Sequence, residues 1–73
     1  MEKVKFVKIV NTRQGFEIQV NDGEKFSKYV HNVYAGKVQY VTDYLYSRKY
    51  KTIQAARKIA NRIATENGAT VIE

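Results

Sequence analysis

One segment near the C-terminus, residues 52–68, has the residue pattern of an amphipathic helix, and it constrains the rest of the fold. At about 100° per residue its apolar side chains fall within one arc of about 140°. These side chains are Ile53, Ala56, Ile59, Ala60, Ile63 and Ala64. Thr52 is a good N-cap and Gly68 a typical C-terminal stop. A helix from about Thr52 to Glu66 therefore needs a second layer to cover its apolar arc, and the alanines would let a sheet approach closely.

Two segments earlier in the chain have the pattern of strands. "KVKFVKIV" (3–10) is rich in β-branched residues, and "FEIQV" (16–20) alternates, with Phe16, Ile18 and Val20 inward. The residues between them, "NTRQG" (11–15), are typical of a turn, so the two segments predict a hairpin over residues 3–20. The alternation of the first strand slips near Phe6–Val7, which a bulge there, or cover on both faces of the strand, would explain.

The middle of the chain predicts two more strands. Asn21-Asp22-Gly23 is a tight-turn signal, because Asn and Gly tolerate positive φ. It is followed by a predicted strand at Phe26–Val30. A second turn at Ala35-Gly36 precedes a predicted strand at Lys37–Thr42.

The fold class follows from these segments. "DYLYSRKY" (43–50) has no clear period and predicts a connection with room for one helical turn. "ATVI" (69–72) predicts a short strand after the helix. The sequence therefore predicts one α+β domain over residues 1–73, in which an antiparallel or mixed sheet of three to five strands packs on one C-terminal helix.

The composition indicates how the fold is stabilised and in which compartment the protein is expected. The 73 residues include no Cys and one His, so neither disulfides nor a metal are expected to support the fold. The absence of Cys fits a reducing cytoplasm. No apolar run approaches the roughly 20 residues of a membrane span, and the N-terminal segment alternates like a strand rather than a signal peptide. We expect a cytoplasmic protein without a membrane segment or a cofactor.

Catalysis has little support in the sequence. General acid–base chemistry needs two titratable groups brought together, and the carboxylates are scattered. Asp43 is better explained as the cap of the turn after Thr42. His31 has no partners at metal-ligand spacing and is better explained as a strand or loop residue. We expect no enzyme activity.

The basic charge is concentrated in one stretch. The net charge is +6, and residues 44–65 carry all the excess in six basic residues with no acid. Cations beside aromatic side chains are typical of single-strand nucleic-acid binders. The candidate binding residues are Arg48, Lys49, Lys51, Lys58, Arg62, Tyr44 and Tyr46. The structural alternative is that the tyrosines pack at the rim of the sheet and that Lys58 and Arg62 occupy the solvated face of the helix. In that alternative Tyr50 packs against the first helical turns.

The block "YVTDYLYSRKYKTIQAARKIANRIATENGATVIE" (40–73) resembles the tail of short phage and prophage proteins of low-GC Gram-positive bacteria. Those proteins have a strand ending near Thr-Asp, a connection, an aromatic residue before Lys-Thr, an alanine-rich helix, a glycine and a last strand. The matching positions are Thr42-Asp43, Tyr50, Lys51-Thr52, Ala56, Ala60, Gly68 and Val71. The resemblance implies a phage-type packing module and assigns no activity to it.

The order of strands followed by one helix is also similar to the arm-type DNA-binding domain of phage and transposon integrases. In that family the helix often opens with Thr and has Ala four residues on, as Thr52 and Ala56 do here. The family places its exposed sheet face in the major groove. That similarity implies contacts from Lys3, Lys5, Glu17, Gln19 and Lys28. This chain lacks the Gly-x-Trp opening and adds a strand after the helix.

Three functions remain open from the sequence. The first, which the concentrated basic charge favours, is an accessory nucleic-acid-binding domain of a phage or mobile element. The second is a modulator that binds a host protein. The third is a self-associating structural domain that forms a homodimer through an exposed edge strand.

Overall fold

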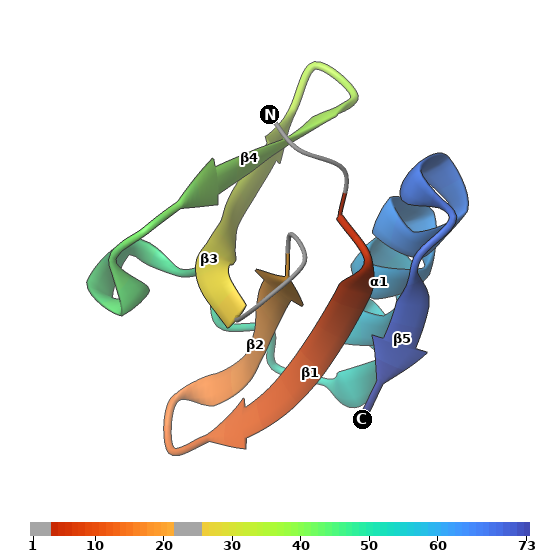
Figure 1. The fold of residues 1–73 in the computed structure, drawn as a ribbon. Coiled ribbons are helices and arrows are strands. Elements are labelled where there is room, and N and C mark those ends of the chain that lie inside the picture. Colours follow the sequence, from red (N-terminus) through yellow and green to blue (C-terminus); the bar gives the residue numbers. More distant parts are fainter. Residues whose placement is uncertain (1–3, 22–25) are drawn as a thin grey trace.

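The computed structural model describes residues 4–21 and 26–73, and it is an α+β fold with one mixed sheet (Figure 1). The strands lie in the order β4-β3-β2-β1-β5. In chain order the elements are β1 (Phe6–Thr12), β2 (Gly15–Asn21), β3 (Phe26–Tyr34), β4 (Lys37–Val41), the 3-10 turn η1 (Tyr44–Tyr46), α1 (Ile53–Asn67) and β5 (Thr70–Ile72). The predicted fold class is confirmed.

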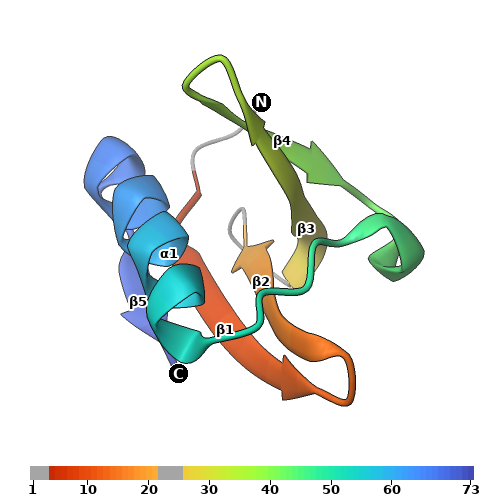
Figure 2. The ribbon, with the colours of Figure 1, turned by 180° about the vertical axis from the view of Figure 1, so that it is seen from behind.

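The core forms between α1 and one face of the sheet. β1 and β2 pair antiparallel, with Val7 opposite Val20 and Ile9 opposite Ile18, so these four side chains share a face. β5 then pairs parallel to β1. α1 covers this face from behind in Figure 1 and lies in front of it in Figure 2. The buried side chains are Val4, Val7, Ile9, Ile18, Val20, Val30, Ala56, Ala60 and Ile63.

The helix ends agree with the sequence. The Thr52 hydroxyl accepts a hydrogen bond from the amide of Ala55 at 3.2 Å. Gly68 adopts φ 67° and donates its amide to the carbonyl of Ala64, as a left-handed C-terminal stop does. No helix in the described part of the chain has the length and hydrophobicity that crossing a membrane requires.

Some details of the strands differ from the prediction. The pairing of β1 with β2 runs without a register shift, so the bulge near Phe6–Val7, one of the two explanations of the slipped alternation, is wrong. Val4 is buried although it precedes β1, and a residue outside the strand need not follow its alternation. The shifts in register lie instead between Val20 and Asn21 and between Val30 and Asn32.

The remaining predicted elements were placed nearly correctly. β3 continues past Val30 to Tyr34, and β4 ends at Val41, one residue before the predicted boundary. η1 supplies the one helical turn for which the connection had room. Residues 22–25 lie outside the described residues, and most of the predicted Asn21-Asp22-Gly23 turn falls on them.

The turn between β3 and β4 is confirmed at Ala35-Gly36, and both residues have positive φ, 52° and 78°. Two-residue hairpin turns of type I′ need positive φ at both positions, and Asn tolerates that conformation better than Ala does. We expect Ala35→Asn to raise the free energy of unfolding by about 0.5–1 kcal/mol. Thermal melting should show a midpoint a few degrees above that of the parent. Ala35→Val should lower the midpoint, and an Asn variant that melts below the parent would contradict the turn geometry.

Candidate functional site

The connection between β4 and α1 carries most of the predicted site residues, and hydrogen bonds fix it to the sheet. The amide of Arg48 donates to the carbonyl of Val30 at 2.8 Å. Tyr50 and Phe16 exchange two backbone hydrogen bonds, each 2.8 Å long. Residues 48–50 therefore run as a short extended segment between β3 and the start of β2. Their backbone is fixed to the sheet, so the Cα positions of Arg48 and Tyr50 are fixed as well.

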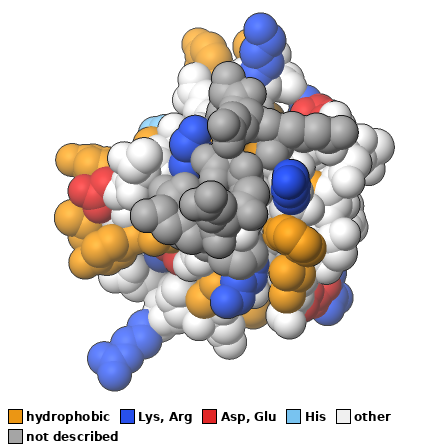
Figure 3. Space-filling view, in the orientation of Figure 1, with side chains coloured by type: hydrophobic (Ala, Val, Ile, Leu, Met, Phe, Trp, Pro, Cys, Tyr) orange, Lys and Arg blue, Asp and Glu red, His pale blue; other side chains and the backbone are white. Residues whose placement is uncertain are grey.

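Before reaching the sheet, the connection forms the exposed turn, which we define as Tyr44, Leu45 and Tyr46. Their exposed fractions are 61%, 71% and 63%. The Asp43 carboxylate accepts a hydrogen bond from the Leu45 amide at 2.9 Å, so its predicted role as a cap is confirmed. The His31 ring, on β3, lies with Nδ1 2.6 Å from the Tyr46 carbonyl. In Figure 3 hydrophobic side chains gather at the left edge, where Figure 1 places this turn.

A buried ion pair lies beneath the exposed turn. Lys49 Nζ is 3.1 Å from Glu17 Oε1, and the exposed fractions of the two side chains are 18% and 7%. The Ser47 hydroxyl donates to the same carboxylate oxygen and accepts from Lys49. Gln19 donates to the other oxygen at 3.0 Å. Both oxygens of this buried carboxylate are therefore hydrogen-bonded.

The position of Glu17 corrects an implication of the integrase similarity. Glu17 does not lie on an exposed sheet face, because the connection folds over it. Burial alone would raise the pKa of the Glu17 carboxyl. The hydrogen bonds from Ser47, Gln19 and Lys49, with the charge of Lys49, outweigh burial and hold that pKa below its ordinary value of 4.5. Of the other implied residues, Lys5 is exposed, Gln19 and Lys28 are half-buried, and Lys3 lies outside the described residues.

The basic stretch is acid-free in sequence but not in space. Three of its six basic side chains pair with carboxylates that lie outside residues 44–65. The pairs are Lys49 with Glu17, Arg57 with Glu73 at 2.7 Å, and Arg62 with Glu66 at 3.2 Å. Lys49 is therefore a structural residue, and the prediction that it contacts a ligand has no support in its surroundings.

Arg62 also differs from the free outer-face residue that the sequence predicts. Besides its pair with Glu66, its guanidinium donates to the carbonyl of Gly36. This bond joins α1 to the turn between β3 and β4. Charge reversal at Arg62 would therefore disturb the fold as well as the surface charge.

The other candidate residues do not form one continuous surface. Arg48, Lys51 and Lys58 are exposed and have no carboxylate partner among the described residues. The exposed turn, however, lies on the far side of the molecule from α1 in both Figure 1 and Figure 2. Tyr44 and Tyr46 are thus separated from Lys58. The predicted set divides into an exposed turn and a group of cations nearer the helix.

Some structural features carried no sequence signal. Leu45 is exposed between two tyrosines, and nothing in its local pattern distinguishes it from a buried leucine. Ser47 is buried in a segment without periodicity. No three His, Asp or Glu side chains within residues 4–21 and 26–73 come together as metal ligands would.

Comparison with known proteins found no matching family model, no matching curated protein and no matching solved structure. Function is therefore inferred from the exposed turn, the buried ion pair beneath it and the exposed cations Arg48, Lys51 and Lys58.

Proposed function

We propose that this protein is a non-enzymatic module that binds a partner protein through the exposed turn. The observation that carries the proposal is the exposure of three adjacent large side chains, at 61–71%, on a turn that is held in place. Single exposed apolar residues are common on protein surfaces, but contiguous ones mark interaction sites. Tyrosine is also enriched among the residues that dominate binding energy at protein interfaces.

The hydrogen bonds beneath the exposed turn favour a binding surface over incidental exposure of these side chains. Three contacts restrain the turn: the cap from Asp43, the hydrogen bond that the Ser47 amide donates to the Tyr44 carbonyl at 3.1 Å, and the contact with His31. Ser47 and Lys49 then tie it to the buried Glu17 carboxylate. A restrained contact surface loses less conformational entropy on binding than a flexible one. The partner that fits is a protein with an apolar recess, because Leu45 has no polar group and the capping carboxylate beside it disfavours a polyanion.

The test is affinity capture with the variant Tyr44→Ser/Leu45→Ser, from a lysate of the organism that carries the gene. Because both side chains are exposed, its free energy of unfolding should stay within about 0.5 kcal/mol of the parent. We expect the variant to lose a protein that the parent captures with or without nuclease. Tyr34→Ser is the matched control, because Tyr34 is 67% exposed at the end of β3. Equal capture by parent and double variant, or equal loss in the control, would overturn the proposal.

A second candidate function is nucleic-acid binding by the three exposed cations of the basic stretch that have no carboxylate partner within the described residues. Arg48, Lys51 and Lys58 favour it, together with the net charge of +6. Three phosphate contacts predict a log–log salt slope of about −2 to −3 with little sequence preference. Lys58→Glu should weaken binding to single-stranded DNA, whereas Arg13→Glu, at the exposed end of the β1–β2 hairpin, should not. Titrations at two salt concentrations measure both, and the absence of binding at low salt would exclude this candidate.

The sequence resemblance suggests the setting of the first function. We infer a small cytoplasmic protein of a phage or mobile element whose partner is a host protein. Recovery of a second copy of the chain instead of a host protein would favour the self-associating alternative, for which β4 and β5 are the sheet edges.

A further inference from the structure

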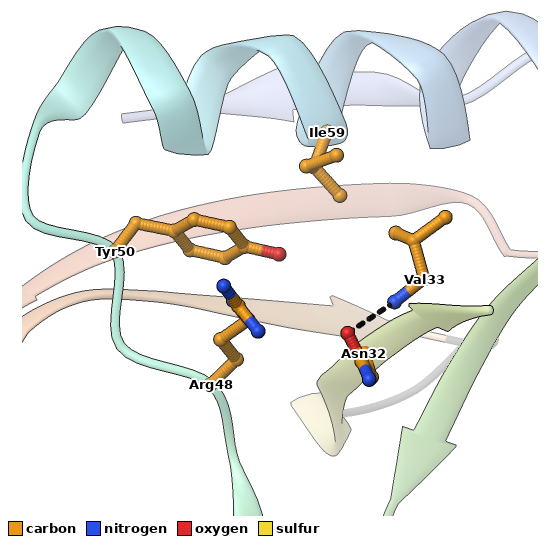
Figure 4. A pocket seen from close by; sticks show the side chains of 5 residues that line it. All are labelled: Asn32, Val33, Arg48, Tyr50 and Ile59. Atoms are coloured by element: carbon orange, nitrogen blue, oxygen red, sulfur yellow. Dashed lines mark hydrogen bonds between the residues drawn. The ribbon is translucent and has the colours of Figure 1, made fainter.

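A pocket lies where α1 does not cover the sheet. α1 packs mainly on β1, β2 and β5, and β3 changes register between Val30 and Asn32. Between the flank of α1 and the second half of β3 this leaves an open pocket of ≈ 230 Å³ (Figure 4). We call it the Arg48 pocket. Its lining residues are Asn32, Val33, Arg48, Tyr50 and Ile59.

The walls of the Arg48 pocket are apolar. Ile59 comes from α1 and Val33 from β3, and the ring of Tyr50 extends beneath the helix toward them (Figure 4). All three side chains are only half-buried. Apolar surface that remains in contact with water gains free energy when a ligand covers it. The walls therefore favour a ring or a branched hydrocarbon group.

The polar groups of the Arg48 pocket are mainly donors. The Arg48 guanidinium lies 5.5 Å from the centre of the Tyr50 ring and has no carboxylate partner among the described residues. Asn32 Oδ1 already accepts the Val33 amide at 2.9 Å, which leaves the NH₂ group of Asn32 to donate. Burial raises the pKa of Tyr50 above its ordinary value of 10.0 although Arg48 acts in the opposite direction, so the phenol also keeps its proton. A ligand that accepts hydrogen bonds and carries negative charge complements these groups.

We propose that the Arg48 pocket binds a carboxylate joined to an aromatic or branched aliphatic group. The guanidinium would hold the carboxylate, and Val33, Ile59 and Tyr50 would cover the apolar group. The pocket is smaller than the roughly 300–1,000 Å³ typical of drug-sized ligands, so it suits one ring or one side chain. Two sources share this chemistry, a free small acid and the C-terminal residue of a peptide.

The backbone of the Arg48 pocket is already in place for binding. The backbone of Arg48 is hydrogen-bonded to Val30 of β3, and the backbone of Tyr50 is hydrogen-bonded to Phe16 of β2. Because the backbone at Arg48 and Tyr50 is held on the sheet, binding has to order side chains only, which lowers its entropic cost. The site is separate from the exposed turn, and Tyr44→Ser/Leu45→Ser should leave it unchanged.

The test follows the methyl NMR signals of Val33 and Ile59 during titration with N-acetyl-phenylalanine, its amide and benzoate. We expect saturable shifts with one or both acids, a dissociation constant in the millimolar range and at least about tenfold weaker binding of the neutral amide. Stronger binding of N-acetyl-phenylalanine would indicate a peptide terminus, and stronger binding of benzoate a free acid.

The variants identify the group that holds the carboxylate. Arg48→Gln should weaken binding of the acids by about tenfold or more while the amide is unaffected, and Arg48→Lys should retain part of the affinity. Arg13→Gln is the matched control, because Arg13 is exposed on the turn between β1 and β2, and it should leave the binding of the acids unchanged. Because Arg48 is exposed, both variants should keep the parent spectrum elsewhere, which separates lost binding from lost fold. Equal binding of acid and amide, unchanged binding by Arg48→Gln, or no saturable shift would overturn the proposal.

Discussion

Ile63→Ala should lower the free energy of unfolding by about 2–5 kcal/mol, because it opens a cavity at a side chain with an exposed fraction of 0%. Ile63 lies on the face of α1 that packs on the sheet, together with Ala56 and Ala60. Neither alanine is long enough to fill the space that the isoleucine leaves. A domain of 73 residues has roughly 4–11 kcal/mol of total stability, so this variant could lose most of it.

Urea unfolding followed by circular dichroism measures the change. Ile72→Ala is the matched control, because Ile72 is 38% exposed on β5, and its loss should be smaller than about 1 kcal/mol. A denaturation midpoint of Ile63→Ala close to that of the control would mean that the buried face of α1 is assigned incorrectly.

Lys49→Met should cost about 3 kcal/mol at neutral pH, because it leaves the buried Glu17 carboxylate without a cation. The value lies at the lower end of the usual range because the Lys49 side chain keeps 18% of its surface in contact with water. Glu17→Gln in the same chain removes the buried charge and should recover part of the loss. A double-mutant cycle from urea unfolding separates the pairing of the two residues from their individual effects.

Lowering the pH should reduce the loss of stability caused by Lys49→Met. In the parent the pKa of Glu17 is held below 4.5, so its contribution to stability is complete above that pH and is lost as the pH falls through the lowered value. Without Lys49 the carboxyl should bind a proton more readily, so the difference between Lys49→Met and parent should shrink in acid. Arg57→Met, which breaks the exposed pair with Glu73, should have a much smaller effect at either pH. A Lys49→Met penalty that did not depend on pH would contradict the charged pairing.

Local signals predicted the helix and the hairpins well. The cap at Thr52 and the stop at Gly68 each depend on hydrogen bonds within a few residues, so the sequence around them contains the necessary information. The turn at Ala35-Gly36 is similar, because two residues determine its geometry. Apolar periodicity correctly identified Ile63 as buried, whereas Ile53 and Ile59, which it placed on the same face, are only half-buried.

The candidate site could be predicted only in part, because it depends on contacts between distant segments. Alternation along β2 placed Glu17 on the face of the sheet that Ile18 does not share. It could not show that Ser47 and Lys49 would cover that face. Likewise, the pair of Arg57 with Glu73 depends on where β5 returns. The pair of Arg62 with Glu66 is different, because it lies within α1 at i, i+4 and follows from local spacing. The exposure of Leu45 again depends on contacts between distant segments. Hydrogen bonds to neighbouring segments position η1, and no periodic pattern of apolar residues marks it in the sequence.

The parallel pairing of β5 with β1 sets the order in which the chain can assemble during synthesis. Val7 lies beside Val71, so the two strands meet only when almost the whole chain is present. Contacts of such long sequence separation slow folding. The β1–β2 hairpin can form early, but its apolar face stays uncovered until α1 follows it. We therefore expect nascent chains that stop before residue 70 to be captured by chaperones, whereas chains that include β5 fold and escape.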